Sequence, residues 1–324
     1  MVALIDRALA AADHPDVAAA LAQQLATVGA LPLDTRLRIV ACLQRVRPAG
    51  AAELGRAALR SGDSVLHGSG YLLLASAGDP GFQALLTKRP APAIDTELAA
   101  RERARDLALG VALHPKPDLV EEGRKRVAAW DRQEAECRGA FARTAGADTE
   151  LLETSGPYID AEAVLGRIAW LAYLSRHDAA AHARAFAREW LWIGEYQDYC
   201  ERTVQGLYKD AQVSDAARPL HQESWRNLSA RLGALRELTR PDVERVLAAR
   251  PADAAAALAE LRFAPQIRDA VNLLGGRPVA ETGDILAALQ KAVHPDMAAF
   301  AAERAAAEGR RVALRELIEE ATAP

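Results

Sequence analysis

The chain has 324 residues, with 40 lysines and arginines against 44 aspartates and glutamates, so its formal net charge is −4. Proteins that grip nucleic-acid phosphates usually carry a basic face or stripe, and this charge balance disfavours nucleic acid as the partner. Half of the residues are hydrophobic but only 5% are aromatic. The apolar excess is alanine, the best helix former, and no segment alternates apolar and polar residues with a period of two. The sequence therefore predicts an all-α fold.

Cysteine usage and the absence of membrane segments indicate the compartment. The three cysteines, Cys42, Cys137 and Cys200, lie far apart, which is typical of reduced thiols rather than of a disulfide framework. Asp6 and Arg7 stand where a signal peptide needs an apolar core. No run reaches the roughly 18 apolar residues that a membrane span needs. We therefore expect a cytoplasmic protein with no membrane partner.

Residues 1–89 contain short apolar segments separated by glycine and proline breakers. We expect helices at residues 3–12, 15–28, 35–46, 50–60, 64–77 and 80–88. Pairs of these helices recur about every 30–35 residues, a period typical of helical repeats. The passage SGDSVLHGSGYLLLASAGDPGFQALLTK, from Ser61 to Lys88, resembles a HEAT repeat, because a small-residue turn joins two apolar helices. The resemblance implies stacked helix pairs, and the alternative is an ordinary helical bundle with short loops.

Two prolines at 88–93 make the best linker candidate, so we expect a repeat-like region at 1–89 and an all-α bundle at 95–324. In residues 95–145, acidic and basic side chains are almost equal in number and form i to i+4 pairs. The segment HisProLysPro at 114–117 divides them into two helices. Such charge runs are typical of solvated helix faces rather than of binding sites.

The stretch from residue 161 to 210 carries most of the tryptophans and tyrosines. We expect one helix that ends near Arg176 and a second that Asp178 caps. The second helix is apolar around most of its girth, so we expect it to be a long central helix. Gly194 and Gly206 are the points at which it would break. The aromatic-rich core helices are expected over residues 158–238.

The same stretch supplies the candidate site residues. Glu195, Asp198 and His182 are candidates for general acid or base, beside aromatic side chains that could line a small-molecule pocket. These aromatic candidates are Trp190, Trp192, Tyr196, Tyr199 and Tyr208. The alternative is that the stripe is core and the charged groups form a structural polar network. Because His177 and His182 are five residues apart and no Glu-x-x-His occurs, no metal site is predicted, and no cofactor is indicated.

In the C-terminal third, Thr239 is expected to cap a helix that has Pro241 near its first turn. The last helices are expected at residues 284–293, 295–309 and 310–321. His294, Pro295 and Asp296 lie between two of these helices, and this arrangement is similar to the J-domain, in which such a tripeptide engages a heat-shock chaperone. The basic run and the aromatic residues of that family are missing here. The alternative is a helix start with proline in the first turn, since the His-Pro pair occurs twice earlier in the chain.

These features support a scaffold or adaptor that binds another protein as the leading hypothesis, with no prediction of oligomeric state. The alternative is an enzyme or small-molecule-binding protein whose pocket lies among the aromatic and acidic residues of 158–225. A pocket would place Glu195 or Asp198 in a cavity, whereas a scaffold would leave both exposed and paired. A third hypothesis, nucleic-acid binding in a HEAT-like groove, requires arginines gathered on one concave face.

Overall fold

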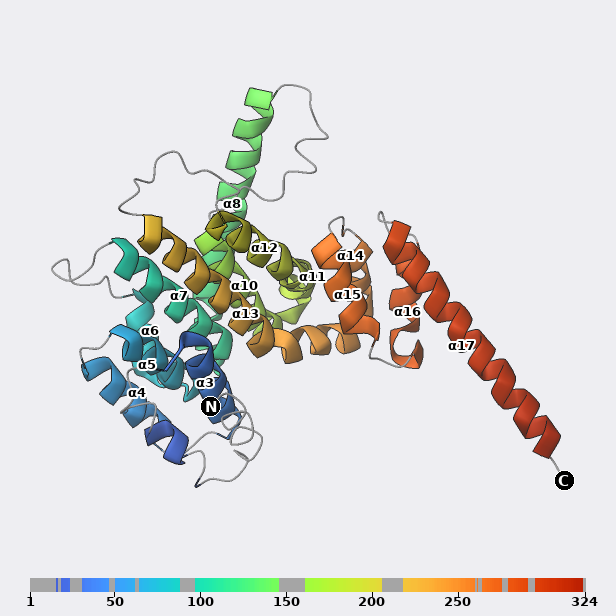
Figure 1. Ribbon diagram of the computed structural model, residues 1–324, viewed down its shortest axis with the longest axis horizontal. Helices are drawn as coiled ribbons and strands as arrows, with labels where there is room; N and C mark the ends of the chain where they lie inside the picture. The colour runs from blue at the N-terminus through green and yellow to red at the C-terminus, as the bar shows by residue number, and fades with distance from the viewer. Residues whose placement is uncertain are drawn as a thin grey trace.

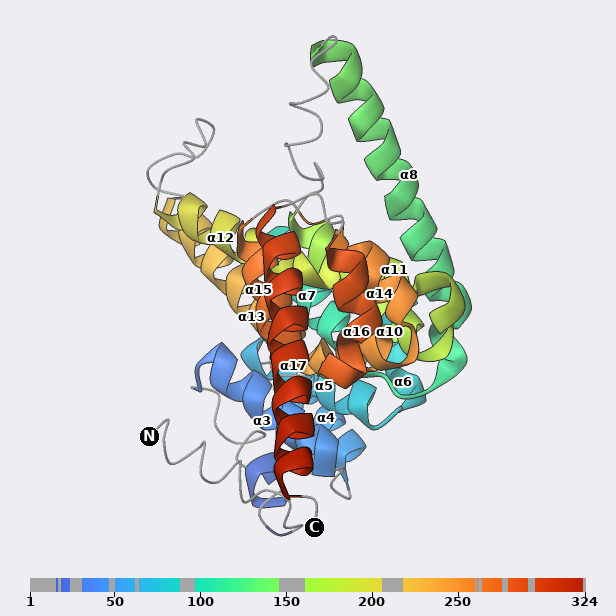
Figure 2. The same ribbon diagram turned by 90° about the vertical axis from the view of Figure 1, so that its right-hand side faces the viewer.

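The computed structural model describes residues 16, 19–23, 31–46, 50–61, 64–87, 97–145, 161–205, 218–259, 261, 264–275, 279–290 and 295–322. Within these ranges the chain forms fourteen α-helices and one short 3₁₀ helix, and it forms no strand. The helices pack into an array from which two long helices extend (Figure 1 and Figure 2). The all-α prediction is therefore confirmed.

The helices fall into two groups in chain order. The first group is α3 (Leu33–Val46), α4 (Ala51–Arg60), α5 (Ser64–Ser76), α6 (Pro80–Thr87), α7 (Glu97–Leu113), the 3₁₀ helix η1 (Pro117–Leu119) and α8 (Val120–Ala145). The second group is α10 (Ala161–His177), α11 (Ala179–Leu191), α12 (Ile193–Val204), α13 (Arg218–Ala249), α14 (Pro251–Ala259), α15 (Ala264–Gly275), α16 (Val279–Leu289) and α17 (Pro295–Thr322). The two long helices that extend from the array are α8 and α17 (Figure 1 and Figure 2).

The four helices predicted between residues 35 and 88 agree with α3–α6 to within two residues at each end, and the predicted break at 114–117 separates α7 from α8. The predicted helix at 3–12 and the predicted linker at 88–93 lie outside the described residues. The division into two regions and the HEAT-like resemblance therefore stay predictions.

The turn between α5 and α6 shows why the glycine and proline signals were accurate. Gly78 has a φ of 61°, a left-handed conformation that glycine adopts without strain. Asp79 then caps α6, because its Oδ1 accepts a hydrogen bond from the Gly81 amide at 2.8 Å. Pro80 occupies the first position of α6, where its missing N–H costs nothing. An ion pair of 2.6 Å between Arg56 and Asp79 ties this turn to α4.

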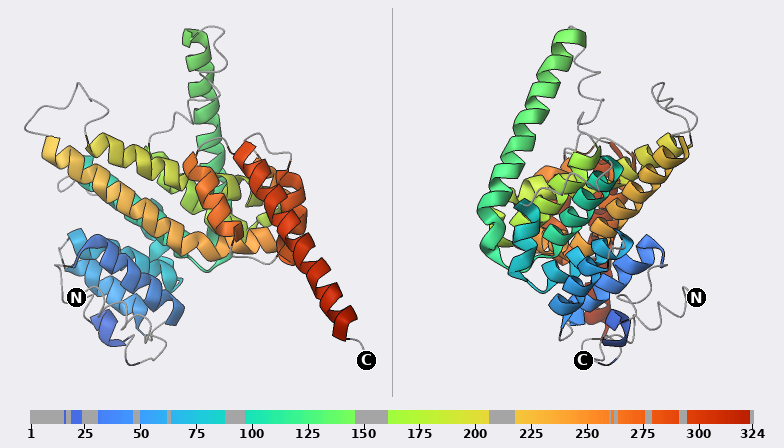
Figure 3. Two further views of the ribbon diagram at one scale, coloured as in Figure 1. Left: turned by 45° about the vertical axis from the view of Figure 1, so that its right-hand side comes forward. Right: turned by 90° about the vertical axis from the view of Figure 1, so that its left-hand side faces the viewer.

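Helix α10 lies at the centre of the array. Every side chain from Val164 to Ser175 is buried except at Gly166. The helix packs against α7, α8, α11 and α13. A helix that is apolar around its girth is stable only when other helices surround it. The N-terminal helices lie to one side of this centre and α14–α17 to the other (Figure 3).

The predicted long central helix beginning at Asp178 is instead two helices, α11 and α12, and the central position belongs to α10. The break falls at Trp192, two residues before the expected weak point at Gly194. There the amide of Trp192 donates to the carbonyl of Glu189, three residues back, at 3.0 Å. Such an i to i+3 bond tightens the last turn of α11 and redirects the chain.

The prediction that Thr239 begins a new helix is wrong, because α13 runs without interruption from residue 218 to 249. The Thr239 hydroxyl donates to the carbonyl of Leu235 at 2.6 Å, and it accepts a hydrogen bond from Trp190 Nε1 at 3.1 Å. Pro241 lies inside the helix, where it removes one backbone hydrogen bond. Figure 1 shows α13 bending along its length, as an internal proline requires.

The predicted break between residues 309 and 310 is also wrong, because α17 continues through Gly309 to Thr322. Pro295 is the first residue of α17, as expected for a helix start. The side chains of the His-Pro-Asp tripeptide at 294–296 lie outside the described residues, and the J-domain-like interpretation stays a prediction.

A buried network of charged groups joins α7 to α13. Arg231 of α13 pairs with Asp106 at 2.9 Å and with Glu102 at 2.7 Å, both on α7. Arg105 pairs with Glu102 at 2.6 Å and donates to the carbonyl of Ser224 at 3.0 Å. Breaking such a network is costly, because each charge removed leaves its partner buried and uncompensated.

Gly68 of α5 packs against this network, and we expect Gly68→Ala to destabilise the protein by about 2 kcal/mol. An added Cβ would lie 2.5 Å from Asp106 Oδ2 and 2.8 Å from Asp106 Cγ, so the carboxylate must move away from Arg231. The control is Gly283→Ala on α16, where an added Cβ meets nothing within 4 Å. That variant should gain up to about 1 kcal/mol from helix propensity. Urea unfolding followed by circular dichroism measures both, and equal stabilities of Gly68→Ala and the parent would contradict the network.

Candidate functional site

Three of the aromatic residues predicted to bind a ligand lie in or against the core. Trp190 and Tyr196 have only 2% and 9% of their surface exposed. The indole of Trp190 donates to Thr239, and the guanidinium of Arg236 lies 5.4 Å from its ring centroid. Trp192 is partly buried, with its ring centroid 6.0 Å from that of Tyr196. These contacts give the three rings a packing role.

The remaining candidates of α12 lie toward the surface. Tyr199 is 41% exposed and meets Trp225 edge-on, with ring centroids 5.7 Å apart. Glu195 and Asp198 are partly buried and already interact with other groups of the protein. Neither carboxylate lines the two clefts described below. Tyr208 lies outside the described residues.

His182 is the predicted catalytic residue that the structure places in a cleft. A cleft of about 460 Å³ lies between α8 and α11, above a buried arginine of α10, and is named here the α8–α11 cleft. Its lining residues are Val127, Asp131, Ala135, Arg167, Ala181, His182, Ala185 and Arg188. A volume of this size is in the range that small-molecule sites occupy.

Alternating charges line the base of the α8–α11 cleft. Arg167 of α10 has 4% of its side chain exposed, and its Nη2 lies 2.8 Å from Asp131 Oδ1. The same nitrogen is 3.6 Å from Glu189 Oε1, which Arg188 contacts at the shorter distance of 2.9 Å. Glu189 is as buried as Arg167, whereas the side chain of Asp131 is 53% exposed. The buried arginine is therefore neutralised mainly by a carboxylate at the solvent edge.

His182 belongs to a second group of charges at one end of the cleft. Its Nε2 lies 3.4 Å from Asp178 Oδ2, and Arg124 Nη2 lies 2.9 Å from the same oxygen. The hydrogen bond from Arg124 lowers the pKa of Asp178. Burial lowers the pKa of His182 despite the neighbouring carboxylate. His182 is therefore a neutral imidazole at neutral pH, suited to accept or donate a hydrogen bond.

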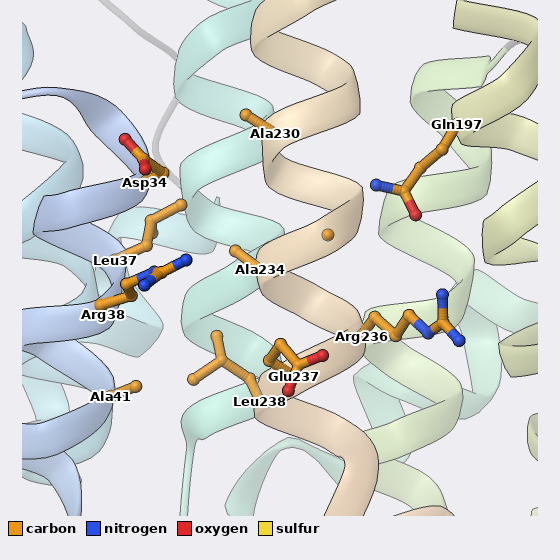
Figure 4. A pocket seen from close by; sticks show the side chains of 11 residues that line it. Asp34, Leu37, Arg38, Ala41, Gln197, Ala230, Ala234, Arg236, Glu237 and Leu238 are labelled. Carbon is orange, nitrogen blue, oxygen red and sulfur yellow. The ribbon is translucent and has the colours of Figure 1, made fainter. Parts of the chain in front are cut away.

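A second cleft, of about 360 Å³, separates α3 from α13 and is shown in Figure 4. Asp34 and Arg38 of α3 lie opposite Ala234 of α13 (Figure 4). Arg236 also lines the cleft, and an ion pair of 2.6 Å to the buried Asp269 holds it in place. Because acidic and basic groups balance on the walls, this cleft has no charge preference for a ligand.

The connector between α7 and α8 is held by the last turn of α10. Tyr173 is fully buried; its hydroxyl donates to the carbonyl of Lys116 at 2.7 Å and accepts from the amide of Leu119 at 2.9 Å. Burial raises the pKa of Tyr173 to about 12. The rings of His114 and His177 lie 6.2 Å and 4.7 Å from the Tyr173 ring centroid. This cluster is structural, because its polar atoms bond to the connector backbone.

The sequence reasoning missed Arg167, Asp131 and Arg188 as cleft residues. The available signal was Arg167 itself, an arginine inside the apolar run VLGRIAWLAYL of α10. A charge on a helix that is otherwise apolar on all sides has to meet a partner or a polar cavity in the interior.

Among the described residues, no three His, Cys, Asp or Glu side chains gather as a group that could hold a metal ion. No helix within the described ranges is long and apolar enough to cross a membrane. Comparison of the chain with protein-family models, with curated proteins and with solved structures finds no match. Function has to be inferred from the geometry alone.

We expect the free energy of unfolding to fall as the pH is lowered from 7.5 to 5.5. Burial, together with the positive charge of Arg176, lowers the pKa of His177, and burial also lowers that of His182. Below the ordinary value of 6.5 the unfolded chain therefore binds protons that the folded protein does not. Urea unfolding at several pH values measures the slope, and His177→Gln should make it shallower. A stability that is constant or rises toward pH 5.5 would contradict this assignment.

Proposed function

We propose that the protein acts by binding another protein, and that helix α17 provides the contact surface. The observation that carries the proposal is the exposure of this helix. Ala301 is fully buried against the array, and Phe300 packs beside it. Beyond this point the helix leaves the body (Figure 1 and Figure 2). Its exposed described residues are Ala302, Glu303, Ala305, Ala306, Ala307, Gly309, Arg310 and Val312.

A helix in this position lacks the usual source of helical stability. Most helical stability in proteins comes from packing one face against other elements, and isolated helices shorter than about 12–15 residues are marginal in water. Residues 302–312 are exposed at nearly every described position, and Val312 is 47% exposed. A partner that packs on this helix would supply the missing contacts.

The character of the exposed helix favours a protein partner over a nucleic acid. Glu303 and Glu308 alternate with Arg304 and Arg310. Small alanine side chains between them allow a second helix to approach closely. A phosphate backbone would require an excess of basic groups, which neither this segment nor the whole chain has.

Helix α8 provides a second extension of the same kind. Its described residues 128, 129, 131–133, 135 and 136 are exposed, and Figure 2 shows the helix reaching past the body. By contrast, the packing of Trp190 and Tyr196 in the core removes them from an accessible pocket. These two features support protein binding over the alternative of an aromatic-lined catalytic pocket.

Removal of residues 309–324 should abolish partner binding while leaving the body folded. The shortened chain keeps the buried Ala301 and the partly buried Arg304 and Glu308. We therefore expect an unchanged unfolding midpoint for the body. Native mass spectrometry of both chains, purified gently from the same host, should show a stoichiometric protein partner on the full chain alone.

The matched control is Glu53→Ala on α4, an exposed substitution remote from α17, which should retain the partner. The proposal fails if the shortened chain keeps the same partner. It also fails if the full chain carries none at the concentrations found in its host.

A further inference from the structure

We propose that the α8–α11 cleft binds a small aliphatic monocarboxylate, with Arg167 and Arg188 holding the carboxylate and the apolar walls contacting the alkyl part. This site is independent of the surface of α17. No residue of the cleft other than His182 was a sequence-based candidate. The inference rests on the placement of charge, on the exposure of the groups and on the shape of the cleft.

The first step of the argument concerns the partner of Arg167. A buried guanidinium requires an anion in contact with it, because an uncompensated buried charge is costly. Here the closest carboxylate, at 2.8 Å, is that of Asp131, whose side chain is 53% exposed. The buried Glu189 is farther away, at 3.6 Å, and is engaged by Arg188 at 2.9 Å. Asp131 can turn to solvent at little cost, and a carboxylate ligand then takes its place on Arg167.

The second step concerns charge. When Asp131 turns outward, the cleft retains the two guanidinium groups of Arg167 and Arg188 against the single carboxylate of Glu189. His182 adds no charge at neutral pH, and the charges of Asp178 and Arg124 beside it offset each other. The site is thus short of one negative charge. A monoanion restores neutrality, whereas a dianion would exceed it.

The third step concerns shape. The walls between the charged groups are Val127 and Ala135 on α8 and Ala181 and Ala185 on α11. These small side chains leave a cleft of about 460 Å³. Ligand sites of this kind combine a mostly apolar lining with a few polar groups that fix orientation. A short alkyl chain can contact the alanine and valine walls while its carboxylate reaches the arginines.

Isothermal titration of the full chain with butyrate tests the proposal, with butyramide as the uncharged analogue and inorganic phosphate as the anion without an alkyl part. We expect saturable butyrate binding with a Kd on the order of 1 mM, as suits a ligand of this size. Asp131→Asn should tighten butyrate binding by roughly five- to tenfold, because the competing charge is removed. Arg188→Gln should weaken it by about tenfold.

Arg188 is 39% exposed, so its substitution leaves the fold intact, which circular dichroism confirms before titration; Arg167→Met serves as a second variant where it folds. The proposal is overturned if butyramide or phosphate binds as tightly as butyrate. It is equally overturned if Arg188→Gln and Asp131→Asn leave the butyrate Kd unchanged. Binding that follows the expected order in both variants supports the site.

Discussion

The last carbonyl groups of a helix have no donor within the helix, and in this protein a side chain of another helix meets the end of α7. Arg176, in the final turn of α10, donates to the carbonyl of Ala112 at 2.6 Å and to that of His114 at 3.3 Å. The same guanidinium pairs with Asp242 of α13 at 2.7 Å. Arg176 therefore ties three helices of the array together at one point.

The position of α8 follows from this junction. Tyr173, one turn before Arg176, fixes the connector through Lys116 and Leu119, from which α8 begins. Gly123 of α8 then lies so close to Trp170 that an added Cβ would be 2.9 Å from the indole. The last turn of α10 thus sets where α8 leaves the body. It thereby sets the opening of the α8–α11 cleft and brings Asp131 over Arg167.

Local signals in the sequence predicted most helix boundaries, because those boundaries depend on backbone chemistry. Gly78 and Pro80 end and begin helices through their own φ preferences, and the neighbouring helices were placed accurately. Pro241 and Gly309 are counter-examples. Tertiary contacts, such as the bond from Trp190 to Thr239, carry α13 through its proline, and α17 continues through a glycine that meets no neighbour.

The site was less accessible to sequence reasoning, because helical periodicity gives the face of a residue but not the element it faces. The aromatic stripe pointed correctly to a crowded region but did not distinguish core packing from a pocket. Arg167, Asp131 and Arg188 are 36 and 21 residues apart along the chain, and only the folding of α8 and α11 against α10 brings them together.

A double-mutant cycle between Arg176 and Asp242 tests the central claim most directly. Arg176→Met, Asp242→Asn and the double variant would be compared with the parent by equilibrium urea unfolding. The account predicts a coupling energy of about 1–3 kcal/mol, because the charges meet in a partly buried junction. Additive effects, to within about 0.5 kcal/mol, would show that the junction does not organise the array.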